Sequence, residues 1–267
     1  MGDIIACANQ KGGVGKTTTV INLAAYLALA GRRVLVVDLD PQGNATSGLG
    51  FDRQSGASSI YPALVDPEFV RSVVQPTQIE GLWLIPSGQD LAGAEVELVN
   101  VPQRERKLSA ALAKLRDSYD FIVLDCPPAV GLLTVNALTA SDSVLVPIQC
   151  EYYALEGLGQ LLATIDLVRD NLNPRLRLAG VLLTMYDSRT TLSSDVAAEV
   201  RRHLNGTVYE TVVPRSVRLA EAPSYGRPIV RYSPESRGAL AYAALADEVL
   251  RRHPASSASE PPAWAGA

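Results

Sequence analysis

The chain has 267 residues, of which 47% are hydrophobic and 19% are charged, and its formal net charge is −4. This composition excludes a disordered chain, and the negative balance excludes a generally basic nucleic-acid binder. The three cysteines, Cys7, Cys126 and Cys150, are far apart within apolar runs, so we expect them to be buried and reduced. We find neither a secretion signal nor an apolar run near the roughly 20 residues that a bilayer requires, and therefore expect a cytoplasmic protein.

Short runs rich in Val, Ile and Leu predict β-strands. In chain order they are Ile4–Ala8, Val34–Asp38, Leu82–Pro86, Phe121–Asp125, Ser143–Pro147, Leu178–Thr184 and Val208–Val213. Longer amphipathic stretches lie between and after them and predict helices at Thr17–Ala30, Arg104–Ser118, Leu132–Ala140, Leu155–Leu172, Ser193–Leu204 and Arg237–Arg252. This alternation is typical of an α/β protein with a mostly parallel, doubly wound sheet and helices on both faces.

Two parts of the chain depart from this alternation. Residues 50–103 have weaker periodicity and several Pro and Gly residues, which predicts irregular structure or an inserted helical segment. Residues 254–267 are rich in Pro, Ala and Ser, which predicts a flexible C-terminal tail. Since we find no boundary within the rest, we expect residues 1–253 to form a single domain.

A glycine-rich loop follows the first predicted strand and opens the first predicted helix; it reads Lys11-Gly12-Gly13-Val14-Gly15-Lys16-Thr17. This is the context of a phosphate-binding P-loop, because glycines let successive backbone N–H groups face the phosphates and the helix N-terminus adds partial positive charge. We expect residues 11–18 to bind nucleotide, with Lys16 reaching the β- and γ-phosphates and Thr17 ligating Mg²⁺. A dinucleotide-binding loop is excluded because Thr18 stands where a third glycine is needed.

Carboxylates stand where two of the predicted strands end. Asp38 and Asp40 belong to the end of the second strand, and Asp125 ends the fourth. In an α/β sheet this edge binds ligands. An apolar strand that ends in Asp is the Walker B pattern, so Asp125 is expected to hold Mg²⁺, in part through water. Asp-x-Asp at a strand end also suits loop solvation or helix capping, so the residues alone leave the roles of Asp38 and Asp40 open.

The lysine that precedes Gly12 makes the loop similar to the deviant Walker A motif, Lys-Gly-Gly-x-Gly-Lys-Thr. Further segments resemble the ParA/Soj chromosome-partitioning ATPases, so the likeness covers nearly the whole chain. They are Asn9–Thr18, Asp38–Gly50, Asp125–Ala140, Gln149–Gly157, Leu182–Thr190 and Val213–Gly226. The later ones, especially Glu151–Gly157 and Arg215–Pro223, separate this family from relatives such as MinD. The resemblance therefore implies a P-loop NTPase fold and ATPase activity with slow intrinsic turnover.

The resemblance also implies roles in catalysis and in nucleotide binding. Lys11 crosses the interface of an ATP-bridged dimer, Lys16 binds the phosphates, and Asp40 orients or activates the attacking water. Asp38 lies near the Mg²⁺ and the lysines. The residues implied at the adenine are Pro214 and Arg215 on one side and Thr184 and Met185 on the other. Ser216 stands where most relatives have Asn, which puts a contact there in doubt.

DNA binding is a further implication of the resemblance. ParA/Soj proteins bind double-stranded DNA without sequence preference when they are dimeric and ATP-bound, and Arg189 and Arg218 match their DNA-binding positions. The charge distribution agrees with this, since residues 169–253 hold 13 arginines and 9 acidic residues, a net of +4. Non-specific binding requires only a patch that neutralises phosphates. Each arginine also suits an ordinary solvated surface position.

The family's partners complete the expected cycle. A ParB/Spo0J-type centromere-binding protein stimulates ATP hydrolysis, and the ADP-bound or nucleotide-free monomer leaves the DNA. The protein is then expected to be cytoplasmic, associated with the nucleoid, and independent of membranes.

Other functions of related proteins were weighed against this one. A MinD-like ATPase ends in a basic amphipathic membrane helix, whereas residues 254–267 carry no basic residue. A redox protein like the nitrogenase iron protein needs two interfacial cysteines per subunit, and no convincing pair is present. A scaffold that binds ATP without hydrolysing it remains a third alternative, against which Asp40 argues.

Overall fold

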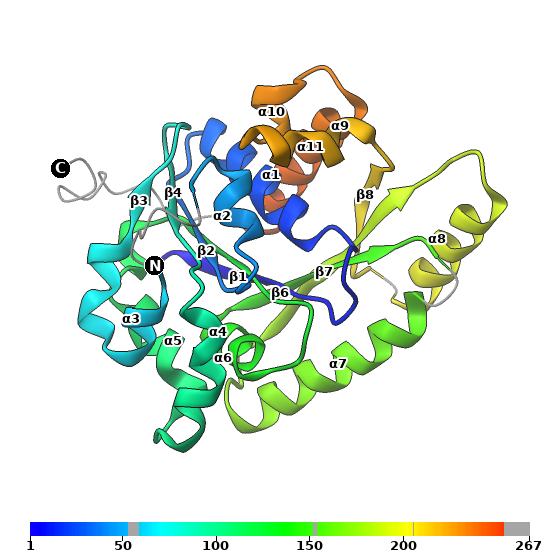
Figure 1. Ribbon diagram of the computed structural model, residues 1–267. Coiled ribbons are helices and arrows are strands. Elements are labelled where there is room, and N and C mark those ends of the chain that lie inside the picture. The colour runs from blue at the N-terminus through cyan, green and yellow to red at the C-terminus, as the bar shows by residue number, and fades with distance from the viewer. Residues whose placement is uncertain (53–58, 152–153, 205, 254–267) are drawn as a thin grey trace.

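The computed structural model describes residues 1–52, 59–151, 154–204 and 206–253, so the predicted tail lies outside the described residues. Strands in this part of the chain form a single sheet in the order β3-β4-β2-β5-β1-β6-β7-β8 (Figure 1). Their bounds are β1 (Asp3–Cys7), β2 (Val34–Asp38), β3 (Gln75–Pro76), β4 (Leu82–Ile85), β5 (Phe121–Asp125), β6 (Ser143–Gln149), β7 (Arg177–Tyr186) and β8 (Val208–Pro214). Neighbouring strands are parallel except β3, which runs antiparallel to β4 at the edge.

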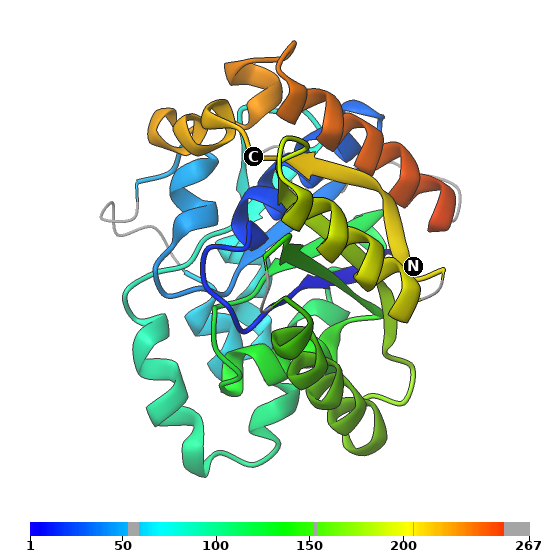
Figure 2. The ribbon, with the colours of Figure 1, turned by 90° about the vertical axis from the view of Figure 1, so that its right-hand side faces the viewer.

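Helices cover both faces of the sheet (Figures 1 and 2). One face carries α1 (Lys16–Leu29), α2 (Asn44–Gly48), α9 (Val217–Glu221), η5 (Ala222–Tyr225), α10 (Ile229–Tyr232) and α11 (Arg237–Arg252). The other carries α3 (Tyr61–Val65), η1 (Pro67–Val73), α4 (Leu91–Glu97), η2 (Leu98–Asn100), α5 (Lys107–Ala113), α6 (Leu132–Ala140), α7 (Ala154–Asn171) and α8 (Thr191–His203). The expectation of a doubly wound α/β fold is confirmed.

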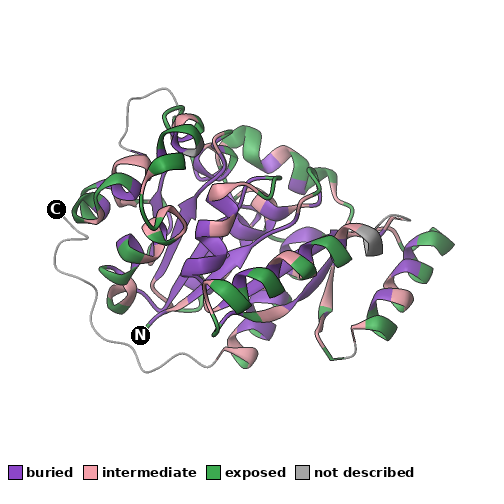
Figure 3. Ribbon diagram, turned by 90° about the horizontal axis from the view of Figure 1, so that it is seen from below, coloured by how far each residue is buried: buried purple, intermediate pink, exposed green. Residues whose placement is uncertain are grey.

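The alternation of side chains along β1 explains the two layers. Ile4 and Ala6 pack into the core beneath α5, α6 and α7, whereas Ile5 and Cys7 pack into the core beneath α1 and α11. Figure 3 shows the result, with buried strands between helices whose outer faces are exposed. In the described part of the chain, none of the helices combines the length and apolar character that crossing a membrane requires.

The predicted strands agree with the structure to within two residues at each end, and β3 is an additional strand. Five of the predicted helices also agree with the structure to within two residues at each end; they correspond to α1, α6, α7, α8 and α11. Residues 50–103 hold only short pieces in their described part, namely α3, η1, β3, β4, α4 and η2, as their weak periodicity predicted.

The prediction of one helix over Arg104–Ser118 is wrong. The segment is divided into η3 (Arg104–Arg106), α5 and η4 (Arg116–Ser118). The side chain of Asn136 explains the first break, because its amide nitrogen donates to the Arg104 carbonyl oxygen at 2.8 Å and its amide oxygen accepts from the Leu108 N–H at 3.1 Å. Asn136 therefore takes both partners of what would have been a helical hydrogen bond.

A buried carboxylate fastens α11 to β8. Glu248 is 3% exposed and accepts hydrogen bonds from the backbone N–H groups of Glu210 and Thr211 at 2.9 and 3.0 Å. Arg252 donates to the same carboxylate at 2.7 Å, and its guanidinium lies 4.3 Å from the centre of the Tyr209 ring. Burial raises the pKa of Glu248, but these hydrogen bonds outweigh it and leave the pKa below its usual value.

We expect Glu248→Gln to lower the free energy of unfolding by about 1–3 kcal/mol at pH 7, because it places an amide N–H₂ against backbone donors. Since the folded-state pKa is depressed, the carboxylate's contribution is present above the unfolded pKa and is lost as the pH falls through the folded one. Urea unfolding should therefore show that the difference in the free energy of unfolding between wild type and variant becomes smaller as the pH falls from neutral to acidic. The exposed Glu235→Gln is the control, and a pH-independent gap would contradict the assignment.

Candidate nucleotide-binding site

The glycine-rich loop crosses the carboxyl edge of the sheet near its centre. It leaves β1, which lies between β5 and β6, and enters α1 at Lys16. Gly13 and Gly15 have φ angles of +75° and +88°, in the left-handed region that favours glycine. The sequence context that predicted a P-loop, strand then loop then helix, is confirmed.

Side chains from neighbouring strands hold this loop in place. The Asn9 amide donates to the Pro147 carbonyl oxygen at 2.7 Å, and its oxygen accepts from the Lys11 N–H at 2.9 Å. On the far side, Thr184 Oγ1 donates to the Val14 carbonyl oxygen at 2.8 Å. Because these anchors come from β6 and β7, the loop is shaped before any ligand binds.

The two lysines of the loop point to different places. Lys16 is 6% exposed, and its ammonium donates to the Lys11 carbonyl oxygen at 3.0 Å, across the loop. The Lys11 ammonium instead forms an ion pair with Glu151 at 2.9 Å, with both side chains nearly half exposed. One lysine is thus held inside the loop, and the other is available at the surface.

A cavity of about 390 Å³ joins the loop to the second strand's carboxylate. Lys16, Thr17 and Thr18 line it together with Asp40 and Met185. The sequence analysis did not single out four other lining residues, namely Gln42, Asn44, Ser47 and Pro223. Gln42 and Asn44 could have been found from the polar run that directly follows Asp40.

A second cavity of about 290 Å³ adjoins the loop on the side of β7 and β8. It brings together the four residues predicted at the adenine, beside Gly15 and Thr18 of the loop; they are Thr184, Met185, Pro214 and Arg215. Met185 has a φ angle of +50°, an uncommon backbone conformation that costs energy and is concentrated at functional sites. Residues that the sequence analysis missed here are Leu219, Ala220 and Tyr242.

Two of the predicted carboxylates lie directly opposite each other. Asp38 of β2 and Asp125 of β5 are paired in register at the carboxyl end of their strands, and both are fully buried. Burial raises the pKa of Asp38 to about 6, while hydrogen bonds from Thr46 act in the opposite direction. Burial, together with the charge of Asp38, raises the pKa of Asp125 well above its usual range.

The surroundings of Asp125 fit a magnesium ion. Both of its carboxylate oxygens are buried and have no hydrogen-bond partner among the described residues. Unpaired buried carboxylate oxygens are costly, and Mg²⁺ prefers oxygen ligands. The Thr17 hydroxyl, on the loop that follows the neighbouring strand β1, supplies a second oxygen of the type that P-loop proteins use.

Thr46 and Ser87 connect the acidic residues, although the sequence analysis did not identify either. Thr46 donates to Asp38 Oδ2 through its N–H at 2.8 Å and its hydroxyl at 2.7 Å. Ser87 donates its N–H to Thr46 Oγ1 at 3.0 Å and its hydroxyl to the Asp40 carbonyl oxygen at 2.7 Å. Asp40 is 7% exposed, and its N–H donates to Asp38 Oδ1 at 3.1 Å. The backbone around Asp40 is therefore fixed from two sides.

The predicted DNA-binding arginines follow adjacent parallel strands, Arg189 after β7 and Arg218 after β8. Both are exposed, and each forms an ion pair in this structure. Arg189 is bound to Asp187 through two hydrogen bonds of 2.9 and 2.7 Å, and it holds the pKa of Asp187 well below its usual value. Arg218 pairs with Glu221 at 3.0 Å. A ligand of these arginines must compete with their acidic partners.

The cysteines do not form a redox site. All three are buried, and Cys7 and Cys126 lie in the cores on opposite faces of the sheet. They cannot present a paired thiolate surface to a second subunit.

Comparison with known proteins identifies a family and several relatives that are similar to this chain. Residues 2–178 match the model of a family described as "AAA domain". The sporulation initiation inhibitor protein Soj of Bacillus subtilis is 57% identical over 249 residues, which are 93% of this chain and 98% of Soj. The chromosome partitioning protein ParA of Myxococcus xanthus is 54% identical over 252 residues, 94% of this chain and 89% of that protein.

A solved structure shares the fold. The crystal structure of cobyrinic acid a,c-diamide synthase from Mycobacterium smegmatis, with bound ADP and magnesium, has a TM-score of 0.83 at 43% sequence identity. The match covers 94% of this chain and 95% of that one. The expected cofactors, ATP or ADP with Mg²⁺, agree with the ligands of this related structure.

The loop, the buried acidic pair at the carboxyl edge and the parallel sheet define a P-loop nucleotide-binding protein. The extent and identity of the sequence matches then specify the family: the chain belongs to the ParA/Soj chromosome-partitioning proteins. The resemblance seen in the sequence is confirmed over most of the chain.

We expect Lys16→Ala to weaken ATP binding by at least about 100-fold, because charge-assisted hydrogen bonds to phosphate contribute roughly 1.5–3 kcal/mol each. Equilibrium titration with a fluorescent ATP analogue measures the change. Lys114→Ala, which removes a surface lysine paired with Glu68, is the control. Unchanged affinity in Lys16→Ala would show that the phosphates lie elsewhere.

Proposed function

We propose that this protein is a DNA-binding ATPase that partitions chromosomes or plasmids and that hydrolyses ATP to ADP and phosphate. The observation that carries this proposal is one cavity in which the P-loop faces Asp40, beside a carboxylate, Asp125, whose buried oxygens have no hydrogen-bond partner within the described residues. Its location at the carboxyl edge of the sheet is where α/β proteins bind nucleotides. Membership of the ParA/Soj family supports the same activity.

Residues of the loop bind and orient the triphosphate. Backbone N–H groups of residues 12–17 surround the phosphates, and Lys16 neutralises charge on the β- and γ-phosphates. The adenine occupies the neighbouring cavity between Met185 and Pro214. Thr17 and Asp125 would hold Mg²⁺, with Asp38 close by, and the ion would supply positive charge to neutralise the phosphates.

Asp40 orients the attacking water toward the γ-phosphate. Its position depends on the Ser87 hydroxyl and the Asp38 carboxylate, which hold its backbone carbonyl and N–H. Since loose positioning by about 1 Å can cost about two orders of magnitude in rate, this fixed backbone matters for turnover.

ATP joins two subunits, and Lys11 crosses the interface to the nucleotide of the partner. A positive group from a second subunit stabilises the charge that develops during phosphoryl transfer. Lys11 must first leave Glu151, an exchange that is inexpensive for an exposed pair. With ADP or without nucleotide the protein is a monomer.

The ATP-bound dimer binds double-stranded DNA through Arg189 and Arg218. Dimerisation doubles the number of phosphate contacts, so affinity becomes dependent on ATP. A ParB/Spo0J-type partner stimulates hydrolysis, and the resulting monomers leave the DNA. In this cycle the protein is cytoplasmic and associated with the nucleoid. A MinD-like membrane ATPase is the alternative, and ATP-dependent sedimentation with liposomes distinguishes it.

For turnover, we expect Asp40→Ala to bind ATP with near wild-type affinity but to stop hydrolysis, because the water is no longer oriented. Ser87→Ala releases the Asp40 carbonyl and should lower kcat about tenfold with little change in ATP affinity. Phosphate release under single-turnover and steady-state conditions measures both. Ser224→Ala, at an exposed position, is the control. Normal hydrolysis by Asp40→Ala would refute its role.

DNA binding is tested with the Asp40→Ala protein, which is expected to stay in its ATP-bound state. We expect binding with ATP but not with ADP or without nucleotide, and a linear fall of log affinity with log salt. Arg189→Ala in the same background should bind more weakly, since it removes one positive charge and leaves Asp187 unpaired near the phosphates. Fluorescence anisotropy of a labelled duplex across a salt series measures this. Absence of binding in every state would refute the DNA role while leaving the ATPase intact.

A further inference from the structure

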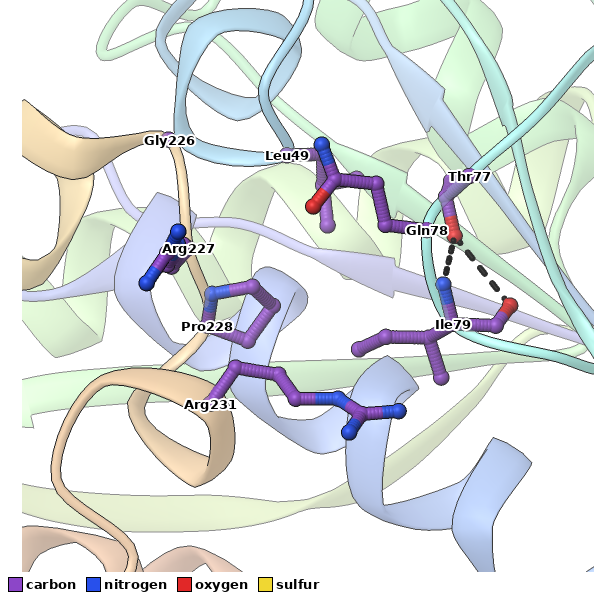
Figure 4. A pocket seen from close by; sticks show the side chains of 8 residues that line it. All are labelled: Leu49, Thr77, Gln78, Ile79, Gly226, Arg227, Pro228 and Arg231. Carbon is purple, nitrogen blue, oxygen red and sulfur yellow. Dashed lines mark hydrogen bonds between the residues drawn. The ribbon is translucent and has the colours of Figure 1, made fainter.

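A cavity of about 310 Å³ lies away from the nucleotide site, between the turn that joins β3 to β4 and the segment that follows η5. Figure 4 shows Arg227 and Arg231 on one side of it, with Gln78 reaching over it from the turn on the other. Leu49 and Ile79, each 3% exposed, form an apolar floor, whereas both arginines are exposed. The cavity thus has a fixed base and a charged rim.

Both walls of this cavity are held rigidly. On one side, Thr77 Oγ1 accepts from the Ile79 N–H at 3.1 Å (Figure 4). It also donates to the Leu82 carbonyl oxygen at 2.9 Å, and the two hydrogen bonds fix the turn. On the other side, the Ile229 N–H donates to the Asn22 side-chain oxygen of α1 at 2.7 Å. The cavity therefore exists before a ligand enters it.

The backbone at the edge of the cavity is equally constrained. Gly226 has a φ angle of +60°, and a Cβ atom at this position would lie 2.8 Å from Gly50 Cα. This contact brings the segment of Arg227 against the residues that follow α2. The wall that carries Arg227 is thus fixed against the chain that supplies Leu49 of the floor.

Arg227 and Arg231 differ from the predicted DNA-binding arginines in their pairing. Over the described ranges of the chain, neither forms an ion pair, whereas Arg189 and Arg218 are both paired with acids. Two guanidinium groups at one rim favour an anion with several acceptor oxygens, and arginine donors match the geometry of phosphate. The Gln78 amide adds a neutral donor opposite them.

We propose that this cavity binds a phosphate of the DNA backbone, with Arg227 and Arg231 as its charged donors. The inference rests on the proposed DNA-binding function and extends its surface beyond Arg189 and Arg218. Because no base contact is involved, the site contributes affinity without sequence preference.

The surface around the cavity favours DNA over a free phosphate as the source of the group. Arg231 directly precedes Tyr232, whose hydroxyl donates to Glu221 at 3.0 Å, and Glu221 is the partner of Arg218. Tyr232 also stacks on the exposed Tyr225, with ring centres 4.9 Å apart. Glu221 thus connects Arg218 to Tyr232, the residue that follows Arg231, so a polymer with repeated phosphates finds further positive charge near the cavity, which a single free phosphate cannot use.

The test compares two charge-matched double variants in the Asp40→Ala protein with ATP. Arg227→Gln with Arg231→Gln removes the rim, and Arg175→Gln with Arg251→Gln removes two exposed arginines that also form no ion pair within the described residues. We expect the rim variant to bind a labelled duplex on the order of tenfold more weakly at moderate salt, with the slope of log affinity against log salt reduced by about 1. The control variant should keep both values near those of its parent, and both should unfold at the parent's temperature.

The outcomes separate this inference from the function on which it rests. Failure of the parent protein to bind DNA refutes the proposed function. Binding by the parent together with equal binding by the two double variants overturns the inference alone. The source of the phosphate is tested by NMR, following the Gln78 side-chain amide during titration with a short duplex or with inorganic phosphate at matched ionic strength. We expect the duplex to shift this signal at far lower concentration, and a shift with inorganic phosphate alone would overturn the assignment to DNA.

Discussion

Two carboxylates buried side by side at the end of parallel strands set the main constraint on this structure. Asp38 and Asp125 are fully buried and paired in register, so their mutual repulsion and loss of hydration must be compensated. Thr46 compensates Asp38 through two hydrogen bonds, whereas the Thr17 hydroxyl and the charge of Lys16 offset the burial of Asp125 only in part. The buried Lys16 and a bound cation can supply the missing positive charge. The site therefore suits a phosphate group together with a metal ion.

The same constraint links the nucleotide loop to distant parts of the molecule. Thr46 lies in α2, which follows the loop of Asp40, and the chain just beyond α2 packs against Gly226. One short helix and one close backbone contact therefore lie between the loop of Asp40 and the segment that carries Arg227.

The predicted DNA-binding arginines are each paired with an acidic residue. Residues 169–253 of this acidic protein carry a net positive charge, and within them Arg189 and Arg218 are paired with Asp187 and Glu221. Exposed pairs of this kind contribute little to stability, so they give way readily to a phosphate.

The sequence by itself determined the strand order along the chain, the phosphate loop and the acidic strand ends, because these depend on local periodicity and spacing. It also placed most of the helices that it predicted within two residues. Only the tertiary structure decided the roles of Asn136, Thr46 and Ser87, since each acts through hydrogen bonds to residues 8–47 positions away. Such contacts depend on strand register and on the direction of each side chain, which no local pattern encodes. The break in the helix predicted over residues 104–118 has the same cause, because a distant amide competes successfully for its backbone groups.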